Sequence, residues 1–170
     1  MDTIPRVPIV DTGPLFDFLW LRYCEDCHCR DLLSGLRYLT SSDSREAIRW
    51  YFGIAKPILT CPQVIAEVHN HAMKRLGNDK LQEFWKIAHK ELIELELDED
   101  LVRLLEMDSE ILCSFGPTDT ALISMAVRRQ MSHPVLTMDG KVAGHCKRKE
   151  IKVLSLGEII HLRQQFGSKS

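Results

Sequence analysis

The sequence predicts an α/β domain with a three-layer α/β/α arrangement, in which helices cover both faces of a central parallel sheet. Short β-branched runs alternate with longer helical patterns along the chain. A helix between consecutive strands implies a right-handed crossover, and therefore a parallel sheet of four or five strands. The length of 170 residues fits one domain, residues 1–170, and 45% apolar with 27% charged residues is typical of a globular chain.

The five expected strands are short apolar or alternating runs that end at turn signals. The first precedes an Asp-Thr-Gly-Pro turn, and the fourth precedes Met-Asp-Gly. In the third, Leu and Ile alternate with Glu at the period of a half-buried strand. The expected strands are residues 7–10, 57–60, 92–97, 134–137 and 151–154.

Apolar residues at helical spacing predict helices in the remaining segments. Pro62 suits the first position of its helix. Asp43 with Glu46 three residues later is typical of a capping box. Asp98 is the expected N-cap of the helix at residues 99–112. A polar, cysteine-rich loop is expected at residues 24–30. The expected helices are residues 15–23, 31–39, 43–52, 62–75, 80–90, 99–112, 119–130, 141–149 and 157–165.

The charge balance and the absence of long apolar runs restrict the class of protein. Lys and Arg total 22 and Asp and Glu total 24, a net charge of −2 that argues against a histone-like cationic field but allows a local basic surface. No apolar run approaches the roughly 18 residues of a membrane span, and residues 1–6 lack the apolar core of a secretory signal. We therefore expect a cytoplasmic protein without a membrane partner, whose six cysteines are thiols.

Four acidic residues occupy positions where an open parallel sheet gathers its functional groups. Asp11 and Asp139 directly follow strands, Asp119 begins a helix after a Gly-Pro break, and Glu67 lies on the helix after the second strand. Such groups meet outside the carboxyl ends of the strands. Carboxylates in one cleft repel each other unless a hard cation such as Mg²⁺ or Mn²⁺ is bound.

Each acid also has an ordinary structural explanation. Asp11 suits an Asx turn, Asp119 a helix cap, and Asp139 before a glycine a tight turn, while Glu67 suits a solvated helix face. For any one of these acids taken singly, the structural explanation is the better one. The order of the four acids along strands and helices is more specific than any one of them.

That order resembles the PIN domain, a metal-dependent ribonuclease family that includes toxins of the VapC type. The resemblance is carried by the stretches PIVDTGPL, CPQVIAEV, PTDTALI and VLTMDG, which begin at residues 8, 61, 117 and 135. The segment between the first two is longer than in the compact toxin members. Residues 24–53 are therefore expected to form a helical insertion after the first helix, one that covers the cleft or binds a partner.

The resemblance implies a site and a reaction. Asp11, Glu67, Asp119 and Asp139 would be the catalytic and metal-binding acids, with the hydroxyls of Thr12 and Thr137 as supports. The family reaction is hydrolysis of an RNA phosphodiester by a metal-activated water. For the toxin branch, an antitoxin protein would be a partner, and whether the chain forms a homodimer stays open.

A group of basic residues follows the last two acids, and these are the expected contacts to RNA phosphates. Ordinary solvated surface charge is the alternative explanation. The group consists of Arg128, Arg129, Lys141, Lys147, Arg148 and Lys149.

Other patterns leave further alternatives. Cys24, Cys27, His28 and Cys29 resemble half of a zinc site, or are free thiols. The Asp-Thr-Gly tripeptide of aspartic proteases occurs here, but that site requires a pair of acids in a β-rich scaffold. A dehalogenase-type phosphatase requires an acid where Gly13 stands. The competing functions are a non-catalytic PIN-like module that binds RNA or protein, and a phosphatase or DNA nuclease on a related fold.

Overall fold

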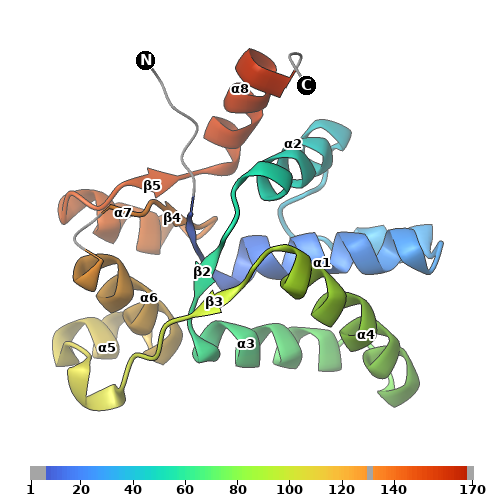
Figure 1. Ribbon diagram of the computed structural model, residues 1–170. Coiled ribbons are helices and arrows are strands. Elements are labelled where there is room, and N and C mark those ends of the chain that lie inside the picture. Colours follow the sequence, from blue (N-terminus) through green and yellow to red (C-terminus); the bar gives the residue numbers. More distant parts are fainter. Residues whose placement is uncertain (1–6, 130–131, 168–170) are drawn as a thin grey trace.

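The computed structural model describes residues 7–129 and 132–167. Two predictions fall outside these ranges. One concerns residues 1–6, expected to lack a secretory signal, and the other is the end of the helix predicted at residues 119–130. The described chain forms one five-stranded, all-parallel sheet in the order β3-β2-β1-β4-β5 (Figure 1). This confirms the predicted α/β class and parallel sheet. The strands are β1 Ile9–Val10, β2 Leu59–Thr60, β3 Asp98–Glu99, β4 Val135–Leu136 and β5 Val153–Leu154.

The central strand β1 sets the register of the sheet. Ile9 pairs with Leu59 of β2 and with Val135 of β4, and Val10 pairs with Leu136. These strand residues are fully or almost fully buried, as expected for a sheet covered by helices. Because the strands are parallel and in register, the chain leaves β1 and β4 at the same edge of the sheet.

The first third of the chain forms α1 Thr12–Asp26, the 3₁₀ helix η1 Arg30–Gly35 and α2 Ser42–Ile54. The prediction of an α-helix over residues 31–39 is wrong, because the chain becomes extended after Gly35. The predicted capping box is also displaced: Ser41 caps α2 together with Ser44, through reciprocal bonds of 3.1 Å. Glu46 instead forms an ion pair with Arg163.

The segment after α3 Pro62–Met73 and α4 Asn78–Glu94 contains the largest error of the sequence prediction. The strand predicted at residues 92–97 is wrong, because α4 continues and buries Leu92 and Leu95 at helical spacing. The exposed β3 follows, so that Asp98 is a strand residue and not a helix cap. The single helix expected at residues 99–112 is replaced by η2 Leu104–Glu106 and α5 Ser109–Phe115.

The last third contains α6 Pro117–Arg128, α7 Gly140–Arg148 and α8 Leu156–Phe166. Gly116, with φ of +83°, forms the turn before α6, a conformation that favours glycine. In Figure 1, α2 lies beside α8, α1 packs against α3 and α4, and α5 packs against α6. This arrangement is compatible with three α/β/α layers. No helix of the described chain is both long and apolar enough to cross a membrane.

Candidate functional site

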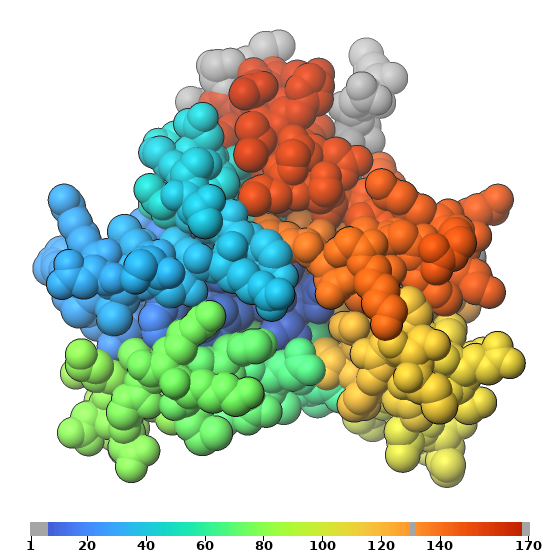
Figure 2. Space-filling view, turned by 180° about the vertical axis from the view of Figure 1, so that it is seen from behind, coloured from blue at the N-terminus to red at the C-terminus, as the bar shows by residue number. Residues whose placement is uncertain are grey.

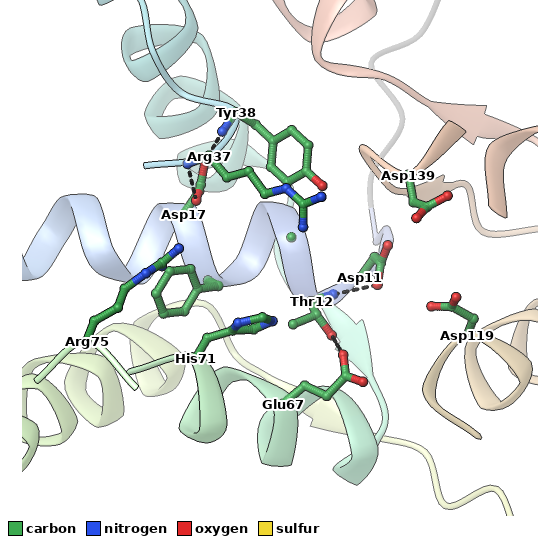
Figure 3. Close-up of a pocket in the computed structure, with 12 residues that line it drawn as sticks. Asp11, Thr12, Asp17, Arg37, Tyr38, Glu67, His71, Arg75, Asp119 and Asp139 are labelled. Carbon is green, nitrogen blue, oxygen red and sulfur yellow. Dashed lines mark hydrogen bonds between the residues drawn. The ribbon is translucent and has the colours of Figure 1, made fainter. Parts of the chain in front are cut away.

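A pocket of about 150 Å³ opens where the chain leaves β1 and β4. Figure 2 shows the same face from outside, with the dark blue start of α1 visible between the light blue segment before α2, the green α3 and the orange start of α7. All four predicted acids line the pocket (Figure 3). The other lining residues are Thr12, Gly13, Phe16, Asp17, Arg37, Tyr38, His71 and Arg75.

Asp11 lies at the bottom of the pocket as the N-cap of α1. One carboxylate oxygen accepts a hydrogen bond of 2.6 Å from the amide of Thr12, and the other accepts one of 2.6 Å from the hydroxyl of Thr137. The residue is 6% exposed, and this burial raises the pKa of its carboxyl despite the two hydrogen bonds. Asp11 is thus both a helix cap and a pocket acid.

Glu67 is held by two threonines from different helices. Its carboxylate accepts a hydrogen bond of 2.9 Å from the hydroxyl of Thr12 and one of 2.8 Å from the hydroxyl of Thr118. The starts of α1 and α6 are therefore tied to the middle of α3. The sequence prediction did not include Thr118. The hydroxyl of this residue, next to Asp119 in the PTDTALI stretch, was the signal that could have identified it.

Asp139 is the N-cap of α7, where one carboxylate oxygen accepts the amides of Lys141 (2.7 Å) and Val142 (3.1 Å). Its own amide donates to the hydroxyl of Thr137, which itself donates to Asp11. Thr137 therefore links these two acids. The second carboxylate oxygen of Asp139 has no hydrogen-bond partner within the described residues, and the residue lines the pocket.

Asp119 differs from the other three acids because nothing within the described ranges donates a hydrogen bond to its side chain. It lies in the first turn of α6, whereas the N-cap is Gly116. Burial raises the pKa of Asp119 to about 7, and the charges of Asp11, Asp139 and Glu67 add to this effect. Mutual repulsion in the pocket is therefore centred on Asp119.

The four acids form one wall of the pocket, the acidic wall. Its oxygen donors fit a hard divalent cation, because it offers carboxylate and hydroxyl oxygens and because a bound cation would relieve the repulsion between the carboxylates. Yet among the residues that the structure describes, no three His, Cys, Asp or Glu side chains gather closely enough to form a metal-binding group. The acids share one pocket without forming a finished coordination shell.

The opposite wall of the pocket is basic and aromatic. In Figure 3, Arg37 and Tyr38 approach from the segment before α2, His71 from the last turn of α3, and Arg75 from the turn that follows α3. Burial, followed by the charge of Arg75, lowers the pKa of His71. None of these four residues is among the acids and hydroxyls that the sequence predicted for the site.

Asp17 explains why the chain before α2 reaches the pocket. Its carboxylate accepts backbone amides from Arg37 (3.2 Å), Tyr38 (2.7 Å) and Leu39 (3.1 Å). Asp17 is only 1% exposed, so these bonds are shielded from water. A single carboxylate within the apolar run LFDFLWL was the sequence signal for this contact.

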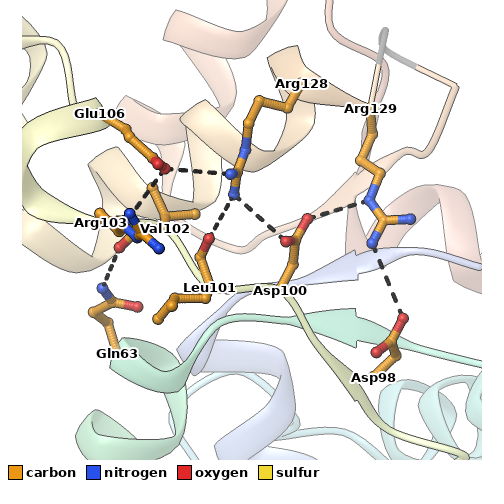
Figure 4. Close-up of polar contacts among 9 residues, drawn as sticks. All are labelled: Gln63, Asp98, Asp100, Leu101, Val102, Arg103, Glu106, Arg128 and Arg129. Carbon is orange, nitrogen blue, oxygen red and sulfur yellow. Dashed lines mark hydrogen bonds and ion pairs between the residues drawn. The ribbon is translucent and has the colours of Figure 1, made fainter.

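The six basic residues predicted to contact RNA do not line the pocket. Arg128 and Arg129 are bound to acids of the β3 region (Figure 4). The amine of Lys141 donates to the carbonyl of Ser114 and lies over the ring of Phe115. The remaining three, Lys147, Arg148 and Lys149, are exposed at the end of α7.

The cysteine-rich segment holds free thiols, as do the other three cysteine positions. Burial raises the pKa of Cys24 to about 12, and burial also raises that of Cys27. Among the residues that the structure describes, this segment does not bring three His or Cys side chains together in a metal-binding group.

No family model matches the chain, and neither a curated protein nor a solved structure shows significant similarity to it. The resemblance to PIN domains therefore rests on the four acid-bearing stretches.

Proposed function

We propose that this protein is a PIN-like, metal-dependent endoribonuclease. The observation that supports this most is the convergence of four acids, from four separate elements, on one pocket at the carboxyl edge of a parallel sheet. In the described chain, none of these acids has an ion-pair partner. Asp119 is buried in part with neither an ion pair nor a hydrogen bond within the described residues, so capping or a turn does not account for its side chain.

Asp11, Asp119 and Asp139 would hold a cation of the Mg²⁺ or Mn²⁺ class, and Glu67 would complete the set. Such a cation, when bound, supplies an activated water and stabilises the charge that develops on the phosphodiester.

The chain itself fixes three of these four acids. Thr137 sets the position of Asp11 relative to Asp139, while Thr12 and Thr118 orient Glu67. Threonine hydroxyls hold the carboxylates without cancelling their charge. Asp119 is left free to turn toward a ligand.

The proposal is tested by a cleavage assay on labelled RNA, with EDTA and with add-back of Mg²⁺ or Mn²⁺. Metal-dependent cleavage is expected, and D119N and D139N should each lower its rate by about 100-fold or more, because outer-shell changes alone cost up to about that much. Cleavage that persists in both variants, or that EDTA does not abolish, would show that the site is assigned wrongly.

Asp108 supplies a matched control for Asp139. It is the N-cap of α5 and accepts the amides two and three residues later at 2.8 and 3.1 Å, the same pattern that Asp139 makes in α7. Asparagine is also a good N-cap, so D108N and D139N should have similar stability. Only D139N should lose cleavage. Equal loss in both variants would point to a folding defect and contradict the assignment.

A further inference from the structure

We propose that Arg37 and Arg75 form a phosphate-binding site on the wall that faces the four acids, and that this site seats single-stranded nucleic acid across the pocket. The inference rests on the proposed function for its substrate, but recognition of oligonucleotide phosphates does not itself require cleavage. Both residues line the pocket and come from different parts of the chain (Figure 3).

The first observation is that these two guanidinium groups are uncommitted. Other arginines make ion pairs at distances of up to 4.0 Å, namely Arg22, Arg49, Arg128, Arg129 and Arg163. Within the described ranges, the side chains of Arg37 and Arg75 make neither an ion pair nor a hydrogen bond. Their donors are therefore available, although carboxylates lie in the same pocket.

The second observation is that aromatic rings position both groups. The guanidinium carbon of Arg75 lies 4.6 Å from the ring centroid of Phe16 and 5.5 Å from that of Trp20. That of Arg37 lies 5.2 Å from the ring centroid of Tyr38. Stacking on a ring fixes the plane of a guanidinium but leaves its edge donors free for two parallel bonds to a phosphate.

The third observation is that the segment carrying Arg37 is anchored from below. The Asp17 carboxylate accepts three consecutive amides of this segment. A Cβ at position 13 would lie 2.9 Å from the ring of Tyr38, so Gly13 lets this ring rest on the first turn of α1. The phosphate site is thus built before a ligand arrives, which lowers the entropic cost of binding.

The two walls together favour a single strand over a duplex. Acids alone would repel a polyanion, and two arginines opposite them supply the attraction that brings phosphates to the pocket. Tyr38 lines the pocket beside Arg37, so an unpaired base can stack on the pair that this ring and the guanidinium form. A duplex offers no such base.

The test is binding of fluorescein-labelled oligouridylate, measured by anisotropy in EDTA so that no cleavage intervenes. R37Q/R75Q should bind about 10-fold more weakly than the unaltered protein, and the slope of log affinity against log salt should fall by about 1.4, at about 0.7 per phosphate contact on a single strand. R37K/R75K should recover part of the affinity, since lysine keeps the charge but not the fork.

R30Q is the matched control. Arg30 is exposed on η1 and lines a different pocket, so this variant removes one positive charge, half of what R37Q/R75Q removes, without touching the phosphate site. Its affinity and salt slope should equal those of the unaltered protein. A loss in R30Q as large, per charge removed, as that in R37Q/R75Q would mean that net charge, not this site, governs binding, and would overturn the proposal.

Other probes define what the site takes. Oligothymidylate should bind with the same dependence on the two arginines, because the recognised group is the phosphate. Binding of a polyglutamate peptide instead of either oligonucleotide would overturn the proposal in favour of an acidic protein segment.

The outcome also separates this inference from the nuclease function. If cleavage requires Asp119 but R37Q/R75Q binds oligouridylate as the unaltered protein does, then the phosphate site alone is wrong. If R37Q/R75Q weakens binding but no RNA is cleaved, then the phosphate site stands without the enzyme.

Discussion

Two regions of the molecule bring arginines close to acids, with opposite results. In Figure 4, Arg128 lies 3.5 Å from Asp100 and 3.3 Å from Glu106, and Arg129 lies 3.3 Å from Asp100. In Figure 3, arginines and acids stand on opposite walls of a pocket without forming an ion pair. Charges in contact cancel and tie β3 to the end of α6, whereas charges held apart leave both walls able to bind a ligand.

Uncharged contacts keep the two walls apart. On the acidic side, hydroxyls of Thr12, Thr118 and Thr137 hold the carboxylates. On the basic side, aromatic rings hold the guanidinium groups, and backbone amides bind Asp17. Apart from Asp119, these charged groups are thus oriented by partners that do not neutralise them. Weakening such a partner should collapse or displace a wall, and this gives the largest expected effect.

D17A is expected to lower the free energy of unfolding by about 3 kcal/mol, because it leaves three amides without their acceptor and creates a void in a buried site. Urea denaturation measures this change. D43A provides a control, since Asp43 is an exposed acid in the first turn of α2 and should cost under about 1 kcal/mol. The comparison of the walls would fail if D17A were as stable as D43A and still bound oligouridylate normally.

Asp119 should make the stability of the metal-free protein depend on pH. Its pKa of about 7 in the folded state exceeds the ordinary value of 3.8, so the folded state binds more protons than the unfolded state between these values. The penalty is absent below pH 4, grows as the pH rises, and is complete above pH 7. Because the residue is partly exposed and water screens its charge, we expect the penalty to reach about 1–2 kcal/mol.

Urea denaturation in EDTA at pH 5 and pH 8 measures this effect, with D119N beside the unaltered protein. D119N should be the more stable of the two at pH 8 and should lose less stability between the two pH values. D108N should follow the unaltered protein, because Asp108 lies outside the pocket. Parallel pH profiles for all three proteins would show that the acids do not repel each other in the pocket.

Arg129 offers a sharper test of the difference between paired and unpaired arginines. Its side chain is 37% exposed, so R129Q should lower the free energy of unfolding by only about 0.5–1 kcal/mol. Its affinity for oligouridylate should not change, in contrast to that of R37Q/R75Q. A loss of affinity in R129Q would mean that the ion pairs of Figure 4 open to bind nucleic acid, and that the two regions do not differ as described.

The sequence predicts the acidic wall better than the basic wall, for a physical reason. Asp11 and Asp139 follow strands, and strand ends of a parallel sheet must meet at one edge, so local pattern and topology suffice to bring them together. Arg37 reaches the pocket only because Asp17, twenty residues earlier, binds the amides of its segment. That contact is tertiary, and it overrides the helical pattern of residues 31–39.

The error at residues 92–97 has the same origin. Leu92, Leu95 and Leu97 satisfy either a strand or the end of a helix, and the periodicity of so short a run does not distinguish them. Packing of α4 against α1 selects the helix, and the strand that pairs with β2 begins only at Asp98, after the end of α4. The prediction that six basic residues contact RNA rests on their closeness in sequence to Asp119 and Asp139. Closeness in sequence does not determine whether a side chain lines the pocket.

The smallest expected effect concerns the basic end of α7. K147Q/R148Q/K149Q removes three exposed positive charges near a helix C-terminus. Each interacts favourably with the helix dipole by about a few tenths of a kcal/mol, so the free energy of unfolding should fall by about 1 kcal/mol or less. If charge alone governed binding, this triple variant would lower the salt slope for oligouridylate by about 2, more than the 1.4 or so expected of R37Q/R75Q. Because none of the three lines the pocket, we expect the reverse order, with no measurable change in the triple variant. A larger slope change in the triple variant would move the nucleic-acid interface from the pocket wall to α7.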